Sequence, residues 1–225
     1  MVDLAAYFAG VEERTAYVQS LGHVVGPSVG PEFMPVLIKG ASRSNLPALF
    51  RARGYTRGAE IGVLYGDYSE ELCQGIPNLH LTCVDRWAPY ESGRTGKTIF
   101  HRAVKAYDVA KERLQPYGCT LCRADSLDAA KTIADGVLDF VYIDANHWFE
   151  HVVADLAAWI PKVRSGGCIA GHDYEEDLEE DNCVKLAVTS WTQAHYVNPW
   201  FVLGRPKVRR GEHRDEHRSW LWFKE

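Results

Sequence analysis

Short apolar runs alternate with amphipathic stretches along most of the chain after residue 58. Five runs have the length and composition of buried strands: Ala59–Val63, Leu79–Val84, Thr120–Arg123, Leu138–Ile143 and Cys168–Ala170. Four stretches between them are candidate helices: Ser69–Gln74, Thr98–Leu114, Leu127–Ala134 and Phe149–Ile160. This alternation predicts an α/β fold in which helices cover both faces of a mostly parallel sheet.

The C-terminal part of the chain predicts a different ending for the sheet. A candidate helix at Val184–His195 is followed by two aromatic-rich runs, Trp200–Leu203 and Ser219–Phe223, with the charged residues 205–218 between them. Two strands joined in this way pair as an antiparallel hairpin. We therefore expect a seven-stranded sheet that is parallel except at its C-terminal hairpin.

The first quarter of the chain is less regular. Leu4–Leu21 predicts one amphipathic helix, and Gly22–Gly40 carries several glycines and prolines that predict a long loop. We expect residues 1–56 to form a small helical and loop segment that covers the cleft of a main domain formed by residues 57–225.

Charge and apolar patterning narrow the choice of partners. The formal net charge of -5 provides no general attraction to nucleic acids or anionic membranes. The first residues lack the basic and apolar pattern of a signal peptide, and no apolar run approaches the roughly 18 residues of a membrane span. We expect a cytoplasmic protein with a small-molecule partner. The aromatic N-terminal segment leaves a homodimer open.

The six cysteines predict a reduced protein. Several lie within apolar runs, as core cysteines do, and the chain is too long to need a disulfide framework. Cys119 and Cys122 have C-x-x-C spacing, but residues three apart on a strand point to opposite faces. A zinc site would also need a second pair or histidines at ligand spacing. We interpret this pair as strand residues of the core.

The stretch from Ala59 to Ser69 predicts a strand, a glycine turn and the start of a helix. Gly62 and Gly66 allow dihedrals and close approaches that a Cβ would forbid, and Asp67 or Ser69 is a candidate N-cap. A dinucleotide-binding turn needs G-x-G-x-x-G. Counting from Gly62, its second and third glycines fall on Leu64 and Asp67, where a carboxylate would repel a pyrophosphate. The turn therefore suits a ligand with hydroxyl or amino groups.

Polar residues follow each of the five predicted parallel strands. The carboxyl ends of such strands meet at one edge of the sheet, where ligands bind. We therefore expect one composite site. Its members are Glu60 at the first strand, Asp85 at the second, Asp125 and Ser126 at the third, Asp144 and His147 at the fourth, and His172 and Asp173 at the fifth.

This order of motifs resembles the class I S-adenosylmethionine-dependent methyltransferases. The resemblance is to the small metal-dependent O-methyltransferases of the catechol and macrolide-sugar types, and it covers the chain from Gly58 to the C-terminus. It rests mainly on Glu60–Ser69, Tyr142–His147 and Gly166–Tyr174. It implies a Rossmann-like seven-stranded fold and methyl transfer from S-adenosylmethionine to an oxygen, or alternatively a nitrogen, of a small molecule.

The resemblance also implies roles for the residues at the strand ends. The glycine turn and Ser69 would lie against the methionine part of the cofactor, Asp85 would bind the ribose hydroxyls, and Asp125 with Ser126 would approach the adenine. The predicted cofactor-binding set is Glu60, Gly62, Gly66, Ser69, Asp85, Arg86, Asp125, Ser126 and Asp144. Carboxylates dominate it, which suits a ligand that offers a diol, an ammonium and an exocyclic amine as donors.

The catalytic half is predicted by the same resemblance. In the resembling enzymes the acid after the fourth strand binds a metal and a base lies three residues later, which corresponds to Asp144 and His147. Asp144 and Asp173 suit Mg²⁺, because hard cations prefer carboxylate oxygens. His172 departs from the family pattern and is a softer ligand that favours Mn²⁺ or another transition metal. The predicted metal ligands are Asp144, Asp173 and His172, with His147 and Asp144 as the catalytic pair.

Two other classes of function stay open. The same fold can serve as a non-catalytic module that binds S-adenosylmethionine or a nucleotide, and a metal site at the strand ends also fits a metal-dependent hydrolase. The run His213–His217 matches the H-x-x-E-H pattern, but that motif requires a helix and this run lies between two predicted strands. We interpret it as a solvated hairpin tip.

Overall fold

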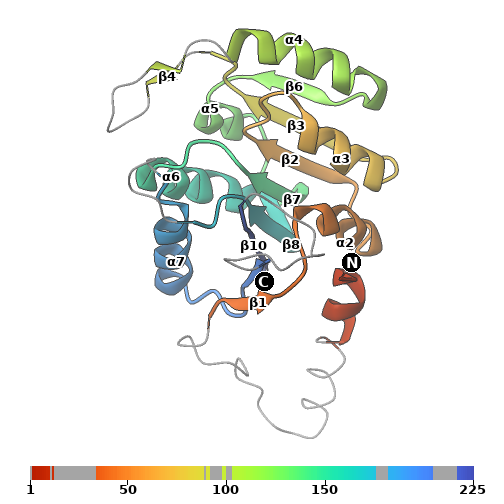
Figure 1. Ribbon diagram of the computed structural model, residues 1–225, viewed down its shortest axis with the longest axis vertical. Helices are drawn as coiled ribbons and strands as arrows, with labels where there is room; N and C mark the ends of the chain where they lie inside the picture. The colour runs from red at the N-terminus through yellow and green to blue at the C-terminus, as the bar shows by residue number, and fades with distance from the viewer. Residues whose placement is uncertain are drawn as a thin grey trace, which may run out of the picture.

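The centre of the computed structural model is an eight-stranded sheet in the order β1-β9-β10-β8-β7-β2-β3-β6 (Figure 1). The structure describes residues 2–10, 12, 34–88, 90–91, 98–99, 103–175, 182–204 and 217–225. The strands are β1 (Val36–Ile38), β2 (Arg57–Ile61), β3 (His80–Asp85), β6 (Thr120–Arg123), β7 (Leu138–Ile143), β8 (Val163–Gly171), β9 (Phe201–Leu203) and β10 (Ser219–Phe223).

The five neighbouring strands from β8 to β6 are parallel, and β10 runs antiparallel to both of its neighbours, β8 and β9. This confirms the predicted α/β, mostly parallel sheet with a C-terminal antiparallel hairpin. A separate two-stranded ribbon pairs β4 (Tyr90–Glu91) with β5 (Thr98–Ile99). The helix predicted to start at Thr98 is therefore wrong in its first part, and helix α4 is Ala103–Leu114.

An eighth strand is the main difference from the predicted sheet. The loop predicted over Gly22–Gly40 contains β1, which pairs in parallel with β9 at the edge of the sheet. Three residues are too few to show a strand period, and their pairing depends on a strand that lies about 165 residues later in the chain. The N-terminal segment thus contributes to the main sheet.

Helices cover both faces of the sheet (Figure 1). One face is covered by α2 (Leu46–Ala52), α3 (Asp67–Gly75) and α4, and the other by α5 (Ser126–Lys131), α6 (Phe149–Trp159) and α7 (Val184–Ala194). Residues 4–10 are also helical, and Phe8 makes edge-to-face contacts with Phe201 and Phe223. The rest of the helix predicted over Leu4–Leu21 lies outside the described residues, apart from residue 12. Within the described part of the chain, no helix is both long and apolar enough to span a membrane.

Successive side chains of a strand point to opposite faces of the sheet, so the sheet has one hydrophobic core on each face. On β7, Phe140 and Tyr142 pack under α2, α3 and α4, whereas Val141 and Ile143 pack under α5, α6 and α7. All four side chains are almost completely buried. These four positions leave no room for a charged side chain in the second half of β7, so the acid on this side of the strand, Asp144, follows its end.

Glycine is required where β2 approaches β7. Gly62 has a φ of +89°, and its N–H donates to the carbonyl of Val84 over 2.8 Å. The N–H of Asp144 donates to the carbonyl of Ile61 over 2.7 Å. A Cβ on Gly62 would lie 2.0 Å from the carbonyl oxygen of Asp144, which is a rigid backbone atom. The missing side chain thus lets the ends of β2 and β7 close together.

Gly66 caps helix α3 with its backbone in the left-handed region, at a φ of +79°. The prediction that Asp67 or Ser69 caps this helix is wrong, because the N-cap is Gly66 and it makes no side-chain cap hydrogen bond. Asp67 instead forms an ion pair with Arg113, and Ser69 points inward to Glu60. A left-handed N-cap turns the chain sharply from the strand into the helix.

Replacing Gly62 by alanine tests how much the close approach matters. We expect Gly62→Ala to lower the free energy of unfolding by about 2–4 kcal/mol, because both the positive φ and the contact with Asp144 oppose a Cβ. Urea denaturation measures this. Gly118→Ala is the matched control, since Gly118 has a φ of +67° with nothing within 4 Å of an added Cβ. Equal losses in the two variants would show that the contact adds nothing.

Candidate functional site

The five parallel strands place the predicted site residues in a row along one edge of the sheet. Their order across the sheet is β8, β7, β2, β3 and β6. Asp173 therefore stands at one end of the row and Asp125 at the other, with Asp144, Glu60 and Asp85 between them. Neighbouring strands lie about 4.8 Å apart, so the row spans roughly 20 Å. Such an edge is long enough for a nucleoside-sized ligand beside a second reactant.

Asp85 holds the glycine turn in place. One carboxylate oxygen, Oδ2, accepts hydrogen bonds from the N–H groups of Val63 and Leu64 over 3.0 and 2.9 Å. The other, Oδ1, accepts from the N–H of Trp87 over 2.7 Å. A carboxylate offers about four acceptor sites, so one stays available to a ligand. Arg86, the next residue in the predicted cofactor set, is exposed.

Glu60 and Ser69 meet beneath the glycine turn. The Ser69 hydroxyl donates to the Glu60 carboxylate, and both side chains are buried. Burial raises the pKa of Glu60 to about 8, against the opposing effect of the hydrogen bond from Ser69. A carboxylate removed from water favours its neutral form, because burial penalises the charged form. Glu60 is therefore suited to a ligand that brings a positive charge to this position.

Asp125 and Ser126 lie at the end of β6 but face different partners. Asp125 is the N-cap of α5 and accepts from the N–H of Leu127 over 3.1 Å. The Ser126 hydroxyl donates to Asp155 over 2.5 Å and accepts from the indole N–H of Trp159 over 2.8 Å. Burial raises the pKa of Asp155 to about 6. Ser126 is thus tied into helix α6, a partner that no pattern in the sequence indicated.

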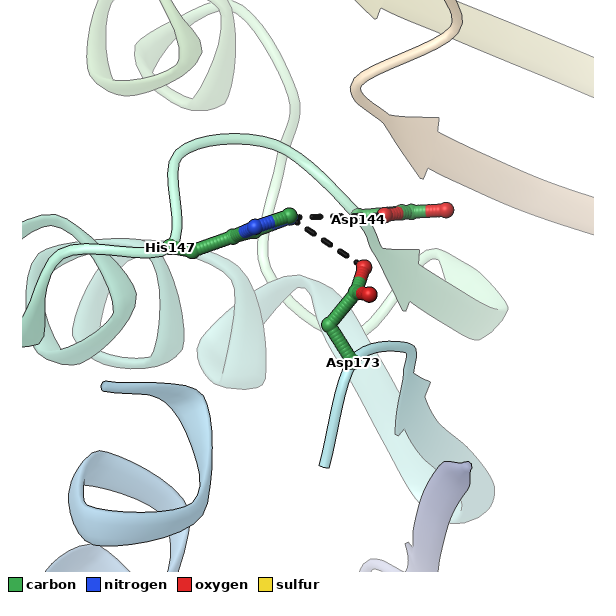
Figure 2. Close-up of side chains that lie close together, drawn as sticks. All are labelled: Asp144, His147 and Asp173. Carbon is green, nitrogen blue, oxygen red and sulfur yellow. Dashed lines mark ion pairs between the residues drawn. The ribbon is translucent and has the colours of Figure 1, made fainter. Parts of the chain in front are cut away.

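Asp144, His147 and Asp173 form the chemical centre at the other end of the row (Figure 2). One ligand atom from each lies within 4.8 Å of the other two. The Nε2 atom of His147 is 3.2 Å from an Asp173 oxygen and 3.8 Å from an Asp144 oxygen. Figure 2 shows the imidazole of His147 pointing between the two carboxylates. Two carboxylates and one imidazole are a donor set that binds divalent cations.

The electrostatics of this centre favour positive charge. Burial alone would lower the pKa of His147, but hydrogen bonds and the negative charges of Asp144 and Asp173 raise it to about 10. In return, His147 and His172 hold the pKa of Asp173 far below its usual range, although burial opposes this. Asp173 also has a φ of +53°, which is strained for a residue other than glycine. The protein thus fixes this carboxylate in its charged form.

His172 approaches the same carboxylates from inside the protein. Its Nδ1 lies 3.1 Å from Asp173 and 3.8 Å from Asp144, while its Nε2 is buried and has no hydrogen-bond partner among the described residues. Of the predicted metal ligands Asp144, Asp173 and His172, the structure brings all three together. The group of described residues whose ligand atoms all lie within 4.8 Å of one another nevertheless contains His147 in place of His172.

Two residues near the centre were missed by sequence reasoning. Arg43, from the N-terminal segment, has its Nη1 atom 3.5 Å from an Asp144 oxygen, and nothing in its irregular sequence context indicated this. The Nε2 atom of His217 lies 3.8 Å from an Asp173 oxygen. The H-x-x-E-H pattern drew attention to His217 but was interpreted as a solvated tip. The rest of that motif lies outside the described residues.

Comparison with known proteins places this chain among methyltransferases. A family model described as a methyltransferase domain matches residues 59–174, slightly more than half of the chain. The protein y4gI of Sinorhizobium fredii (strain NBRC 101917 / NGR234) is 32% identical over 121 residues, which are 52% of this chain. That alignment spans only 13% of y4gI.

Solved structures share the fold at low sequence identity. An O-methyltransferase from Bacillus cereus in complex with SAH is 15% identical with a TM-score of 0.57, over 94% of this chain and 90% of that one. TomG from Streptomyces achromogenes, an O-methyltransferase of tomaymycin synthesis in complex with SAM, is 14% identical with a TM-score of 0.54, over 81% and 79%. The cofactor-bound Rv0187 from MTB is 22% identical with a TM-score of 0.55, also over 81% and 79%.

The raised pKa of Asp155 predicts a stability change with pH. Its pKa rises from 3.8 to about 6 on folding, so the folded state binds the proton more tightly and stability falls as pH rises from about 4 to about 6. We expect Asp155→Asn, which cannot ionise, to match the wild type near pH 4 and to exceed it by up to about 2 kcal/mol at pH 7. Urea denaturation at each pH measures the difference.

Asp128→Asn is the control for this experiment. Asp128 lies in α5, and its side chain is 70% exposed beside Lys131. Its replacement should change stability by no more than about 0.5 kcal/mol over the same range. A constant difference between Asp155→Asn and the wild type from pH 4 to pH 7 would contradict the assignment.

Proposed function

Because the chain belongs to the methyltransferase-domain family, we propose that it transfers the methyl group of S-adenosylmethionine to an oxygen of a small molecule. The observation that carries the proposal is the convergence of Asp144, His147 and Asp173 next to the glycine turn of β2. Methyl transfer needs a sulfonium donor and a nucleophile held in line with it. The row of strand ends offers a place for each.

The cofactor half of the proposed site runs from β2 to β6. Glu60 would face the ammonium group, Asp85 the ribose hydroxyls, and Asp125 the adenine. Gly62 and Gly66 would let the backbone approach the methionine part, and Ser69 would orient Glu60 through their hydrogen bond. The Bacillus cereus and Streptomyces achromogenes structures of the same fold hold SAH and SAM, which supports this choice of cofactor.

The acceptor half of the proposed site is the group at the ends of β7 and β8. Its residues fit a divalent cation such as Mg²⁺ or Mn²⁺, since two carboxylates supply hard oxygen ligands and His172 supplies a nitrogen, which leaves His147 for the role of base. A cation bound there would supply Lewis acidity that lowers the pKa of a coordinated acceptor hydroxyl. The Nδ1 atom of His172, which faces both carboxylates, is the nitrogen placed to complete this donor set.

His147 is the proposed base at this centre. With its pKa near 10 the imidazole carries a proton at neutral pH, so it acts first as the counter-charge of Asp144 and Asp173. Once another positive charge neutralises the two carboxylates, the imidazole loses that stabilisation and Nε2 can take the proton of the acceptor hydroxyl. Asp144 and Asp173 would then orient the ring, and Arg43 would hold Asp144 from the side of the N-terminal segment.

Binding of S-adenosylhomocysteine, measured by titration calorimetry, tests the central claim. We expect saturable binding by the wild type and at least a tenfold loss of affinity in Asp85→Ala, because the variant loses a charged acceptor for the ribose hydroxyls. Asp128→Ala is the control for loss of a surface carboxylate and should bind as the wild type does. Circular dichroism checks that each variant is folded.

The outcomes of that titration separate the claims. A wild-type chain that binds neither S-adenosylmethionine nor S-adenosylhomocysteine would refute the proposed function and leave the non-catalytic nucleotide module or the hydrolase. Unchanged affinity in Asp85→Ala would remove only Asp85 from the site. If the cofactor binds, release of S-adenosylhomocysteine with a panel of phenols, catechols and sugars identifies the acceptor class.

The metal part of the proposal is tested by titrating Mn²⁺ and following the electron paramagnetic resonance signal of the free ion. We expect the wild type to remove one equivalent of free Mn²⁺ and Asp173→Asn to bind at least tenfold more weakly, because a charged ligand is lost. Asp135→Asn is the control, since Asp135 is a 70% exposed acid paired with Lys162. Equal binding by wild type and Asp173→Asn would exclude this metal site while leaving the cofactor claim intact.

A further inference from the structure

Three cysteine thiols converge on the α2–α3–α4 side of the sheet. Cys73 belongs to α3, Cys83 to β3, and Cys119 directly precedes β6. The sulfur atoms of Cys73 and Cys119 lie 3.4 Å apart, although the two residues are 46 positions apart in the chain. The Cys83 thiol donates to the Ser69 hydroxyl over 3.4 Å. We name Cys73, Cys83 and Cys119 the thiol cluster.

The C-x-x-C pair does not share this arrangement. Cys119 packs against the core under α3 and α4, whereas Cys122 packs against the core under α5 and α6. Residues three apart on a strand do point to opposite faces, as their spacing predicted. The partner of Cys119 is therefore Cys73, which belongs to a different element of the fold.

The members of the thiol cluster differ in access to solvent. Cys73 and Cys119 are partly exposed, whereas Cys83 is fully buried. A small reagent can therefore reach Cys73 and Cys119 without unfolding the protein. Among the described residues, the only group of three or more whose ligand atoms lie close enough together to hold a metal ion is Asp144, His147 and Asp173. The thiol cluster is thus better suited to sulfur chemistry than to metal binding.

We propose that Cys73 and Cys119 form a reversible disulfide by exchange with a small disulfide such as oxidised glutathione. Their sulfurs need to approach by about 1.4 Å to reach the length of an S–S bond. The disulfide would be a modification that is chemically separate from methyl transfer. Its formation does not depend on whether the proposed cofactor binds.

Cys119 is the nucleophile in this exchange. The hydrogen bond from Cys73 lowers the pKa of Cys119, outweighing the opposite effect of burial, and the same contact raises the pKa of Cys73. The Cys119 thiolate attacks one sulfur of oxidised glutathione and releases one glutathione thiolate, which takes up a proton. Cys73 then loses its proton, attacks the Cys119 sulfur and releases the second glutathione. Two protein thiols are oxidised and one glutathione disulfide is reduced.

Peptide mapping of the full chain tests the proposal. The chain is equilibrated with oxidised and reduced glutathione, free thiols are blocked with an alkylating agent, and tryptic peptides are analysed by mass spectrometry. We expect peptide 58–86 to be linked to peptide 114–123, and dithiothreitol to reverse the link. Since each peptide contains two cysteines, single variants assign the bond.

The variants distinguish the thiol pairs. We expect Cys122→Ser and Cys83→Ser to keep the link, and Cys119→Ser and Cys73→Ser to lose it. The link between the two peptides is measured first in the wild-type chain, so the main result does not depend on whether a variant folds. The proposal is overturned if Cys122→Ser or Cys83→Ser abolishes the link. It is also overturned if oxidised glutathione leaves only mixed disulfides, or if all six thiols stay open to alkylation.

Discussion

The absence of a Cβ at Gly62 is the constraint on which the site depends. Any side chain there would collide with the backbone carbonyl of Asp144, so β2 and β7 could not end side by side. Asp85 completes the arrangement, since its carboxylate binds the N–H groups of the two residues that follow Gly62. The glycine turn, Asp85 and Asp144 are thereby held as one rigid unit, and a displacement of any of them moves the others.

The charged centre at β7 and β8 follows from a second requirement. Asp144 and Asp173 lie partly buried and close together, which is unfavourable unless a positive charge is near. In the folded chain, His147, His172 and Arg43 supply it. The same residues would share that role with a bound cation. The positions of the histidines are therefore explained by electrostatics alone, and catalysis is an additional role that the proposal assigns to one of them.

Several groups around the site lower the stability of the folded state, because they are buried or strained. Glu60 and Asp155 are buried carboxylates with raised pKa values, and Asp173 has a strained backbone. Such features persist only where the surrounding structure holds them, and they concentrate at functional sites. The thiol cluster lies directly beneath, joined to Glu60 through Ser69 and Cys83. Buried polar chemistry thus extends from the strand ends into the core.

The sequence by itself determined the order of strands and helices, and with it the row of acids at the strand ends. Thr120–Arg123 and Leu138–Ile143 were predicted with the bounds that the structure has, because short apolar runs flanked by glycine and polar residues are typical of strands. The glycine turn could also be predicted, because its glycines follow directly after a predicted strand. Sequence could not place β1, Arg43 or His217, because their partners are set by which segments meet in space.

Only the tertiary structure decided which polar groups pair. Ser126 was assigned by resemblance to the adenine but is bound to Asp155 and Trp159 from another helix. The spacing indicated that Cys119 does not face Cys122, but only the packing of α3 shows that it lies against Cys73. The hydrophobic pattern of a single helix or strand depends on its own periodicity and can therefore be read from the sequence. Contacts between elements depend on how those elements pack, and no single stretch of sequence contains that information.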